Sequence, residues 1–323
     1  MSERWVWDRY WHCDRIASCF DGAGARNYGD SIAAGWREYF AELPEQARII
    51  DLCTGNGAIA LMAAEAGKAN SKGFAITAVD QADIDPPSYV TRNREEMAAI
   101  QFVGRTEVEA LPFPDESFDV AISQYGLEYS NLDRAVPEMV RVLRRSGRIR
   151  LVIHAAEGVI AAGSRKVIAD ADLLLDAIDL IGAARRCLDA VARVERGDGS
   201  MIARQRANAA VADFKTALRL TSGHIPHAED KIMFNNSGGV LLDAFQARGK
   251  VGHSAALAKV ETVESEILAH RGRLRALVDS ALDKNSVEAL IEQLKEAGAI
   301  KAKWGKLENA EGLIGYVATA RFA

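Results

Sequence analysis

The fold is decided by the stretch from residue 48 to residue 60, which reads RIIDLCTGNGAIA. A short apolar strand that carries Asp51 runs into a turn containing Gly55 and Gly57. Glycine lets the backbone approach a ligand where a Cβ would clash. The free N–H groups at the start of the next helix, predicted over Ala58–Ala66, point at such a ligand. The stretch therefore predicts a strand–turn–helix unit that holds a small molecule.

Short apolar runs and helical segments alternate on the C-terminal side of this unit. Strands that alternate with helices form right-handed βαβ units, so the pattern predicts an α/β fold with a Rossmann-like, doubly wound and mostly parallel sheet. Near the C terminus, strand signals at Ala299–Trp304 and Leu313–Arg321 are joined by a short turn and predict a terminal antiparallel hairpin. The other predicted strands are Arg48–Leu52, Ala75–Val79, Ile100–Val103, Phe118–Ser123 and Ile149–His154.

The chain divides into three regions by pattern. Residues 1–45 hold four of the five Trp and predict a helical, aromatic N-terminal cap, whose rings either pack on the sheet or cover a pocket. Residues 46–156 and 285–323 predict the sheet domain. Residues 157–284 show helical periodicity and few strand signals, which indicates a large helical insertion. An apolar seam over 260–277 steps by three and four and favours helix packing or a homodimer.

Composition limits the class of protein. The 323 residues are 49% hydrophobic and 26% charged, which is typical of a folded globular protein. The net charge of −5 argues against nucleic-acid binding. No apolar run approaches the roughly 18 residues of a membrane span, and the first residues lack the order of a secretion signal, so a cytoplasmic location is expected. Four scattered cysteines and the pair His224 and His227 predict neither a disulfide framework nor a metal site.

The glycine turn fits two classes of ligand. Gly55, Gly57 and Ala60 match the dinucleotide fingerprint G-x-G-x-x-G/A, and Asp80 follows at about the 20-residue distance of a ribose-binding carboxylate, so a nicotinamide-dependent oxidoreductase is one interpretation. Asp51 favours another interpretation, because a carboxylate at the strand end attracts a cation rather than a pyrophosphate. A zwitterionic adenosine ligand with an ammonium group and no phosphates suits Asp51 and Asp80 better.

The residues around this turn resemble the class I S-adenosylmethionine-dependent methyltransferases, particularly the small-molecule group that includes quinone-biosynthesis enzymes. Residues 51–57, DLCTGNG, are similar to the family's first motif DLGCGTG, with Cys53 in place of a glycine. Residues 107–119, EVEALPFPDESFD, resemble the family's DAExLPFPDxSFD. Residues 123–128 and 138–148 resemble the segment after the family's fourth strand and the end of the helix that follows it. The resemblance covers the predicted sheet domain and not the helical insertion.

The resemblance implies a role for each matching residue. Asp51 would hold the methionine ammonium group, and Gly55 and Gly57 would let the backbone pass under the methionine and the ribose. Asp80 would accept both ribose hydroxyls, because a carboxylate offers two oxygens to a vicinal diol. The remaining members of the implied cofactor set are Glu107 and Val108 at the adenine, Gln124 and Tyr125 at the sulfonium end, and Cys53, Asn56 and Gln81.

The implied activity is methyl transfer from S-adenosylmethionine to a small-molecule acceptor. A methyl sulfonium is already activated, so in-line displacement needs alignment and a dry site, and a base only where the acceptor loses a proton. His154 ends the fifth predicted strand at the ligand-binding edge, and His154 and Tyr125 are the candidate catalytic residues, ahead of Tyr28, His12 and Glu128. A hydrogen-bonded histidine at the pocket edge is the alternative. A protein that binds this cofactor without catalysis is a third functional interpretation.

Overall fold

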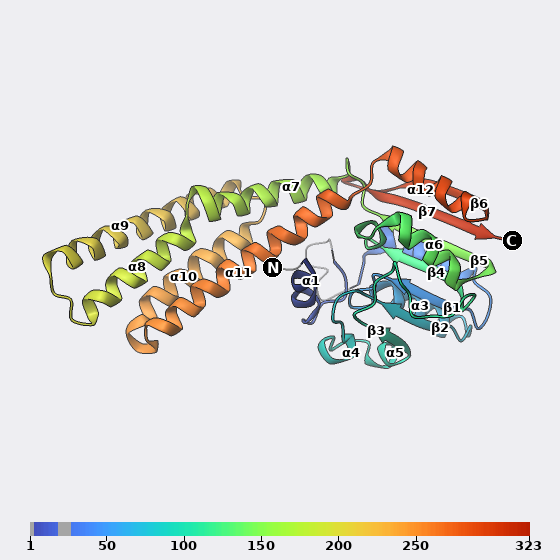
Figure 1. Cartoon of the computed structure of the whole chain (residues 1–323), viewed down its shortest axis with the longest axis horizontal. Coiled ribbons are helices and arrows are strands. Elements are labelled where there is room, and N and C mark those ends of the chain that lie inside the picture. Colours follow the sequence, from blue (N-terminus) through green and yellow to red (C-terminus); the bar gives the residue numbers. More distant parts are fainter. Residues whose placement is uncertain (1–2, 19–26) are drawn as a thin grey trace. The chain divides into compact units, whose positions relative to one another are not determined.

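The computed structural model describes residues 3–18 and 27–323 of the chain. The chain packs as two compact units (Figure 1). We call residues 1–162 with 276–323 the sheet unit and residues 163–275 the helical unit. All predicted site residues belong to the sheet unit.

The described part of the sheet unit contains the strands β1 (Arg48–Leu52), β2 (Ala75–Val79), β3 (Ile100–Val103), β4 (Phe118–Gln124), β5 (Leu143–Ile153), β6 (Ala299–Asn309) and β7 (Gly312–Phe322). They form one sheet in the order β3-β2-β1-β4-β5-β7-β6. Pairing is parallel from β3 to β5, whereas β7 runs antiparallel to both β5 and β6. The predicted fold class, including the terminal hairpin, is confirmed.

Helices cover both faces of this sheet. Helices α2 (Asp30–Ala41) and α3 (Ala58–Ala69) pack on one face, and α6 (Leu132–Val142) and α12 (Lys284–Glu296) pack on the other. Successive strand residues point to opposite faces, so neighbouring isoleucines of β1 enter different cores. The other described helical elements of this unit are α1 (Glu3–Trp11), α4 (Pro86–Tyr89), α5 (Arg94–Ala98) and the 3-10 turn η2 (Leu127–Tyr129).

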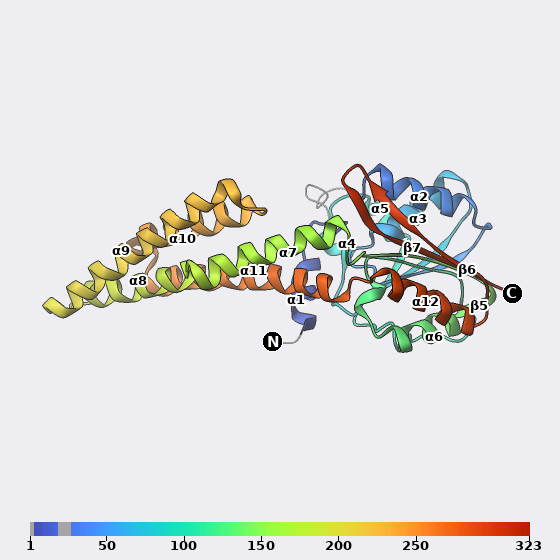
Figure 2. The same ribbon diagram turned by 90° about the horizontal axis from the view of Figure 1, so that it is seen from above.

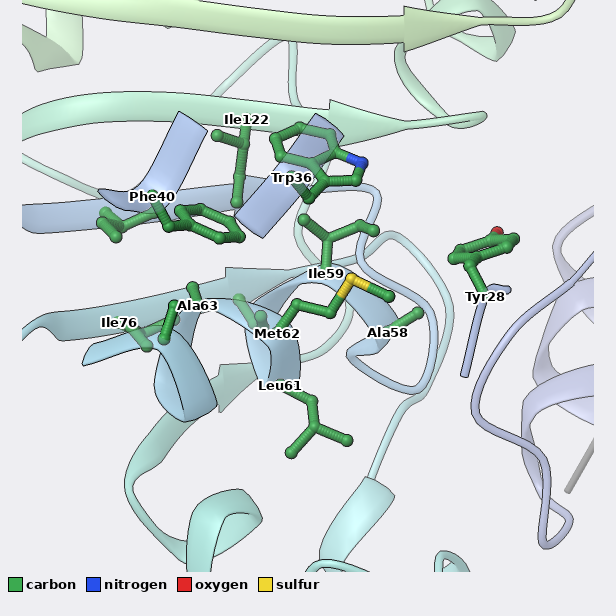
Figure 3. Close-up of a cluster of buried hydrophobic side chains, with 14 of the residues drawn as sticks. Tyr28, Trp36, Phe40, Ala58, Ile59, Leu61, Met62, Ala63, Ile76 and Ile122 are labelled. Atoms are coloured by element: carbon green, nitrogen blue, oxygen red, sulfur yellow. The ribbon is translucent and has the colours of Figure 1, made fainter. Parts of the chain in front are cut away.

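The core between α2, α3 and the sheet is built around aromatic rings (Figure 3). Trp36 and Phe40 of α2 are fully buried, with ring centroids 5.6 Å apart. They belong to one cluster with Ile59 of α3 and Ile122 of β4. Large buried rings contribute strongly to core energetics. This part of the aromatic N-terminal region therefore packs on the sheet, which is one of the two roles expected for it.

Two segments have regular structure beyond the predicted strands. Strand β5 begins at Leu143 rather than at Ile149, because Leu143 already pairs with Phe118 and a register irregularity before Val120 restores the ladder. Residues 86–98, outside the predicted strands, form the two short helices α4 and α5. Asn93 separates them, since its φ of 52° is left-handed and cannot continue a helix.

The helical unit contains α8 (Leu180–Glu195), α9 (Met201–His224), the 3-10 turn η4 (Ile225–His227), α10 (Lys231–Val251), the π-helical segment η3 (Leu173–Ala177) and most of α7 (Val159–Asp172) and α11 (His253–Ser280). Within this unit, α9 and α10 form one layer, and α8 and α11 form the other (Figure 2). No helix among the described residues combines the length and the apolar character that crossing a bilayer requires.

The apolar seam predicted on α11 is used inside the helical unit. Val260, Val263 and Ile267 are buried in one cluster with Phe214 of α9 and Phe234 of α10. The seam is therefore a helix-packing face, which is one of the two roles that its periodicity favours. This packing covers Val260, Val263 and Ile267, and the homodimer stays a prediction.

Candidate functional site

The turn after β1 has the geometry that its glycines predict. Gly55 and Gly57 have φ values of +55° and +82°, in the left-handed region that favours glycine. A Cβ built on Gly57 would lie 2.8 Å from the ring of Phe102, and one on Gly55 would overlap the ring of Trp11. Neither position tolerates a side chain without a shift of an aromatic neighbour.

Asp51 holds the turn against the start of α3. Its Oδ2 accepts hydrogen bonds from Thr54 Oγ1 at 2.6 Å and from the Ala60 N–H at 3.1 Å. The side chain is buried, and this burial raises the pKa of the carboxyl to about 7, although the two hydrogen bonds oppose the shift. A cation placed beside this carboxylate would favour its charged form. The residue is therefore suited to bind a ligand ammonium group.

Asp80 joins the ends of β1 and β2. Its Oδ2 accepts from the Gly55 N–H and its Oδ1 from the Ala82 N–H, both at 2.8 Å. Burial raises the pKa of this carboxyl to about 6, in spite of these two bonds. Each carboxylate oxygen has a further lone pair to offer a ligand hydroxyl.

A first cavity of about 590 Å³, including its open mouth, lies at the carboxyl ends of β1, β2 and β4. The chain order of the sheet reverses between β1 and β4, and ligands of such sheets bind at this switch point. The cavity brings together six of the predicted cofactor residues. Its lining is Trp7, Trp11, Cys53, Asp80, Gln81, Thr106, Glu107, Val108, Glu109, Tyr125, Gly126, Tyr129 and Ser130.

A second cavity of about 330 Å³ contains Asp51 and Gln124. Trp11, Cys53 and Tyr125 line both cavities, so these three side chains stand at the boundary between them. The other lining residues of the second cavity are Ile16, Ser18, Tyr28, Thr54, Ala58 and Ile59. Together the two cavities collect eight of the eleven predicted cofactor residues.

Gln124 presents a hydrogen-bond donor to the second cavity. The indole Nε1–H of Trp36 donates to Gln124 Oε1 at 2.6 Å, which sets the orientation of the amide. The amide Nε2 is buried and has no hydrogen-bond partner among the described residues. A buried donor without an acceptor is unfavourable, and a ligand carboxylate would satisfy it. The cavity thus offers a carboxylate, Asp51, and an amide donor, which is the set that an amino-acid zwitterion needs.

The three turn residues Gly55, Asn56 and Gly57 are not among the described residues that line either cavity. Asn56 contacts the N-terminal segment. Its Nδ2 donates to the carbonyl oxygens of Trp11, Cys13 and Arg15 at 2.9, 3.3 and 2.7 Å. The side chain is fully buried, and its hydrogen bonds anchor the N-terminal region on the turn.

His154 is packed behind Tyr125. Its Nδ1 lies 2.8 Å from Glu128 Oε1, and the Tyr125 ring stacks on it with centroids 4.1 Å apart. His154 is buried and is not among the described residues that line either cavity. The Tyr125 hydroxyl donates to the Ile314 carbonyl at 3.0 Å. The predicted base therefore packs against the Tyr125 ring, and it is this ring that lines both cavities.

The other catalytic candidates also differ in whether they line a cavity. Tyr28 lines the second cavity, whereas His12 is exposed and its Nε2 lies 2.6 Å from the Asp83 carbonyl oxygen. Sequence reasoning missed Trp7 and Tyr129 as lining residues. The concentration of aromatic residues in the first 45 positions is a sequence signal for Trp7, whereas no local sequence signal marks Tyr129.

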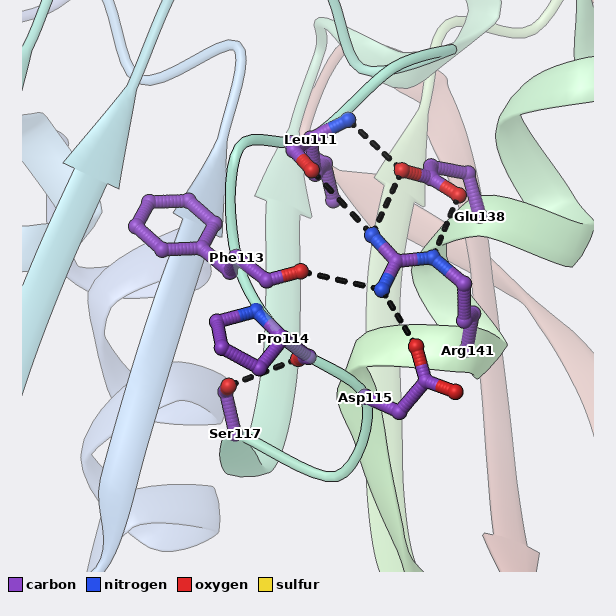
Figure 4. Close-up of polar contacts among 7 residues, drawn as sticks. All are labelled: Leu111, Phe113, Pro114, Asp115, Ser117, Glu138 and Arg141. Carbon is purple, nitrogen blue, oxygen red and sulfur yellow. Dashed lines mark hydrogen bonds and ion pairs between the residues drawn. The ribbon is translucent and has the colours of Figure 1, made fainter.

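The motif at 107–119 is held in place by one arginine (Figure 4). The guanidinium of Arg141 donates to the carbonyl oxygens of Leu111 and Phe113 and pairs with Asp115 and Glu138. Glu138 also accepts from the Leu111 N–H at 2.7 Å. The motif residues from Leu111 onward thus fix a loop, and that loop carries Glu107 and Val108 to the first cavity.

Comparison with known proteins identifies the family of this site. Residues 50–151 match a family model described as a methyltransferase domain. The ubiquinone/menaquinone biosynthesis C-methyltransferase UbiE of Xanthomonas campestris pv. campestris is 32% identical over 140 residues, which are 40% of this chain and 54% of that protein. The demethylmenaquinone methyltransferase of Thermus thermophilus is 33% identical over 121 residues, 35% of this chain and 51% of that protein.

Among solved structures, the YcgJ protein of Bacillus subtilis aligns with 25% identity and a TM-score of 0.33 over 46% of this chain and 60% of that one. The chain spans about half the length of the curated relatives it matches. The domain match and these relatives confirm the family expected from the motifs: residues 50–151 form a methyltransferase domain of the class I S-adenosylmethionine-dependent type, similar to that of the quinone-biosynthesis methyltransferases.

Proposed function

We propose that this protein transfers a methyl group from S-adenosylmethionine to a small-molecule acceptor. The observation that carries the proposal is that Asp51 and the unpartnered amide nitrogen of Gln124 both lie at the second cavity. The amino-acid end of the cofactor fits there, with its ammonium group at Asp51 and its carboxylate at Gln124 Nε2. Asp80, Glu107 and the Val108 backbone suit the ribose and the adenine in the first cavity.

When bound, the cofactor supplies an electrophilic methyl group. A lone pair of the acceptor forms the new bond to the methyl carbon while the carbon–sulfur bond breaks, and its electron pair stays on the sulfur as a neutral thioether. The residues of the chain contribute orientation and exclusion of water. Tyr125, Trp11 and Cys53 at the boundary of the two cavities would surround this reacting centre. No proton transfer is assigned to His154, because it lies behind Tyr125.

The rival functions predict different ligands. A nicotinamide-dependent oxidoreductase would use the same turn for a pyrophosphate, which the carboxylate of Asp51 in the second cavity would repel. The match to a methyltransferase domain does not favour that alternative either. A scaffold that binds the cofactor without catalysis would bind S-adenosylhomocysteine and give no turnover with phenol, amine and quinol acceptors. A cytoplasmic location and a homodimer stay predictions, and light scattering at micromolar concentration tests the second.

Changing Gln124 to Glu should weaken S-adenosylhomocysteine binding by about thirtyfold, equivalent to about 2 kcal/mol. The substitution replaces the amide donor by an oxygen that repels the ligand carboxylate. Binding of 5′-methylthioadenosine, which lacks the amino-acid end, should not change. Isothermal titration calorimetry with both ligands measures the difference, and the exposed Gln101→Glu is the matched control. Equal weakening of both ligands, or no change for either, would contradict the assignment of the second cavity.

A further inference from the structure

The outer face of the α9–α10 layer exposes apolar side chains. Of the eight large hydrophobic residues that are exposed in the described parts of the chain, seven lie on these two helices. Ile202, Leu220 and Ile232 are 64%, 54% and 70% exposed. Ile202 and Leu220 lie about five turns apart on one line of α9, which flanks the line of the buried Ala203 and Thr221. The other four are Met201, Val240, Leu242 and Val251.

The same two helices carry a net positive charge. They contain seven Lys or Arg residues and two Asp, a net charge of +5 in a chain whose total is −5. Exposed cations are interleaved with the apolar side chains on α9 and α10. The exposed ones are Arg204, Arg206, Lys215, Arg219, Lys231 and Lys250.

These six cations lack the carboxylate partners that several other cations of the helical unit have. None of them makes an ion pair with a described residue, whereas on the other helices of the unit Arg185, Arg186 and Arg193 each pair with a carboxylate at 2.6 to 2.7 Å. On α10, Arg248 is also paired, with Glu195. The outer face of α9 and α10, which we call the cationic face, therefore joins unneutralised charge to exposed aliphatic groups.

We propose that the cationic face binds the surface of an anionic lipid bilayer. Aliphatic side chains enter the boundary between headgroups and acyl chains, and Lys and Arg attract the phosphate groups, which is the combination found in interfacial helices. The helices would lie on the bilayer and not span it, in keeping with their composition. The inference is independent of the proposed function, since vesicle binding requires neither cofactor nor turnover.

Two other partners fit the face less well. A second copy that presents the same face would bring two patches of the same sign together, and like charges repel. Nucleic acid would neutralise the cations but would leave Ile202, Leu220 and Ile232 without an apolar partner. The boundary between lipid headgroups and acyl chains accommodates both the cations and the exposed aliphatic side chains.

Sedimentation of the full chain with vesicles tests the proposal. Vesicles of 30% phosphatidylglycerol in phosphatidylcholine should bind the protein, and pure phosphatidylcholine should bind it at least tenfold more weakly. Binding should fall as NaCl rises from 0.05 to 0.5 M, because salt screens the charges. The combined variant Ile202→Asp, Leu220→Asp, Ile232→Asp should lose at least tenfold in partition coefficient, and so should Arg206→Glu with Lys215→Glu, since each charge at the surface contributes about fivefold.

Matched controls lie on the edge strand of the sheet unit. Ile300 is 62% exposed, so Ile300→Asp repeats the apolar change elsewhere, and Lys301→Glu with Lys303→Glu repeats the change in net charge. Both controls should bind vesicles as the unaltered chain does, and circular dichroism should show unchanged helix content in all variants. No binding to anionic vesicles, or equal loss in the controls, overturns the proposal. A dimer that the triple variant alone abolishes, found together with no vesicle binding, would also overturn the proposal. Binding of duplex DNA in preference to vesicles would overturn it as well.

Discussion

Replacing Asp51 by Asn should make the unliganded protein more stable at pH 8 and weaken its affinity for S-adenosylhomocysteine about a hundredfold. Burial raises the pKa of this carboxyl from 3.8 to about 7, so the charged form is unfavourable in the empty cleft. The neutral amide removes that cost, on the order of 2 to 4 kcal/mol, and keeps an oxygen to accept from Thr54 and Ala60. It also removes the negative charge that would bind the ligand ammonium group.

The direction of the pH dependence follows from the same shift. Between pH 4 and 7 the folded state binds more protons at Asp51 than the unfolded state, so the free energy of unfolding falls as pH rises through this window. Above about pH 7 the stabilising contribution of protonated Asp51 is fully lost. Ligand affinity should change in the opposite sense and rise through pH 7, because the ionised carboxylate binds the ammonium group.

Denaturant unfolding and calorimetry between pH 5 and 8.5 measure both quantities. In the Asp51→Asn variant, the contribution of this residue to both pH dependences should disappear, which leaves a weaker one from Asp80, whose pKa is about 6. The exposed Asp279→Asn is the control and should match the unaltered protein. A variant that is less stable at pH 8 yet binds S-adenosylhomocysteine normally would show that Asp51 serves only the turn.

Replacing Gly55 by Ala should destabilise the protein by about 3 kcal/mol. About 1 kcal/mol comes from the left-handed backbone, where a Cβ is strained. The rest comes from the Trp11 ring, which the new Cβ would overlap, so that the turn becomes overpacked. The same substitution should weaken S-adenosylhomocysteine binding at least tenfold, since Trp11 lines both cavities.

Gly73 provides the matched control for this substitution. Its φ of +60° is close to that of Gly55, but no atom lies within 4 Å of the position that a Cβ would take there, so Gly73→Ala should carry only the backbone strain. Urea unfolding of the two variants separates the cost of backbone strain from the cost of the overlap with the Trp11 ring. If Gly55→Ala costs no more than Gly73→Ala, then Trp11 does not pack on the turn in solution. Adding Trp11→Ala to Gly55→Ala should recover the contact part of the loss.

The fold and the cofactor cleft could be predicted because their signals are local. A strand that ends beside Asp51, two glycines that need left-handed φ, and Asp80 at the end of the next strand all lie within one βαβ unit. Parallel strands bring their carboxyl ends to one edge, so short sequence patterns suffice to place these groups.

The contacts that the sequence does not predict connect distant parts of the chain. The ring of Trp11 reaches Gly55, and the amide of Asn56 binds the carbonyl of Trp11, because the N-terminal segment crosses the turn. No periodicity encodes such a crossing. The strand pattern brings His154 to the correct edge, but its position behind Tyr125 depends on the direction of two side chains. The apolar seam of α11 shows the same limit: a pattern reveals that a face is apolar and not what covers it.

We propose that this cleft holds an adenosine cofactor by its amino-acid end. The most direct measurement is calorimetric titration of the unaltered chain at pH 8 with S-adenosylhomocysteine, 5′-methylthioadenosine and NAD. We predict that S-adenosylhomocysteine binds at least tenfold more tightly than 5′-methylthioadenosine, because Asp51 and Gln124 contribute only to the former. NAD should give no heat of binding. Equal affinity for the two adenosine thioethers would show that Asp51 and Gln124 do not bind the amino-acid end, and binding of NAD in place of both would show a dinucleotide site.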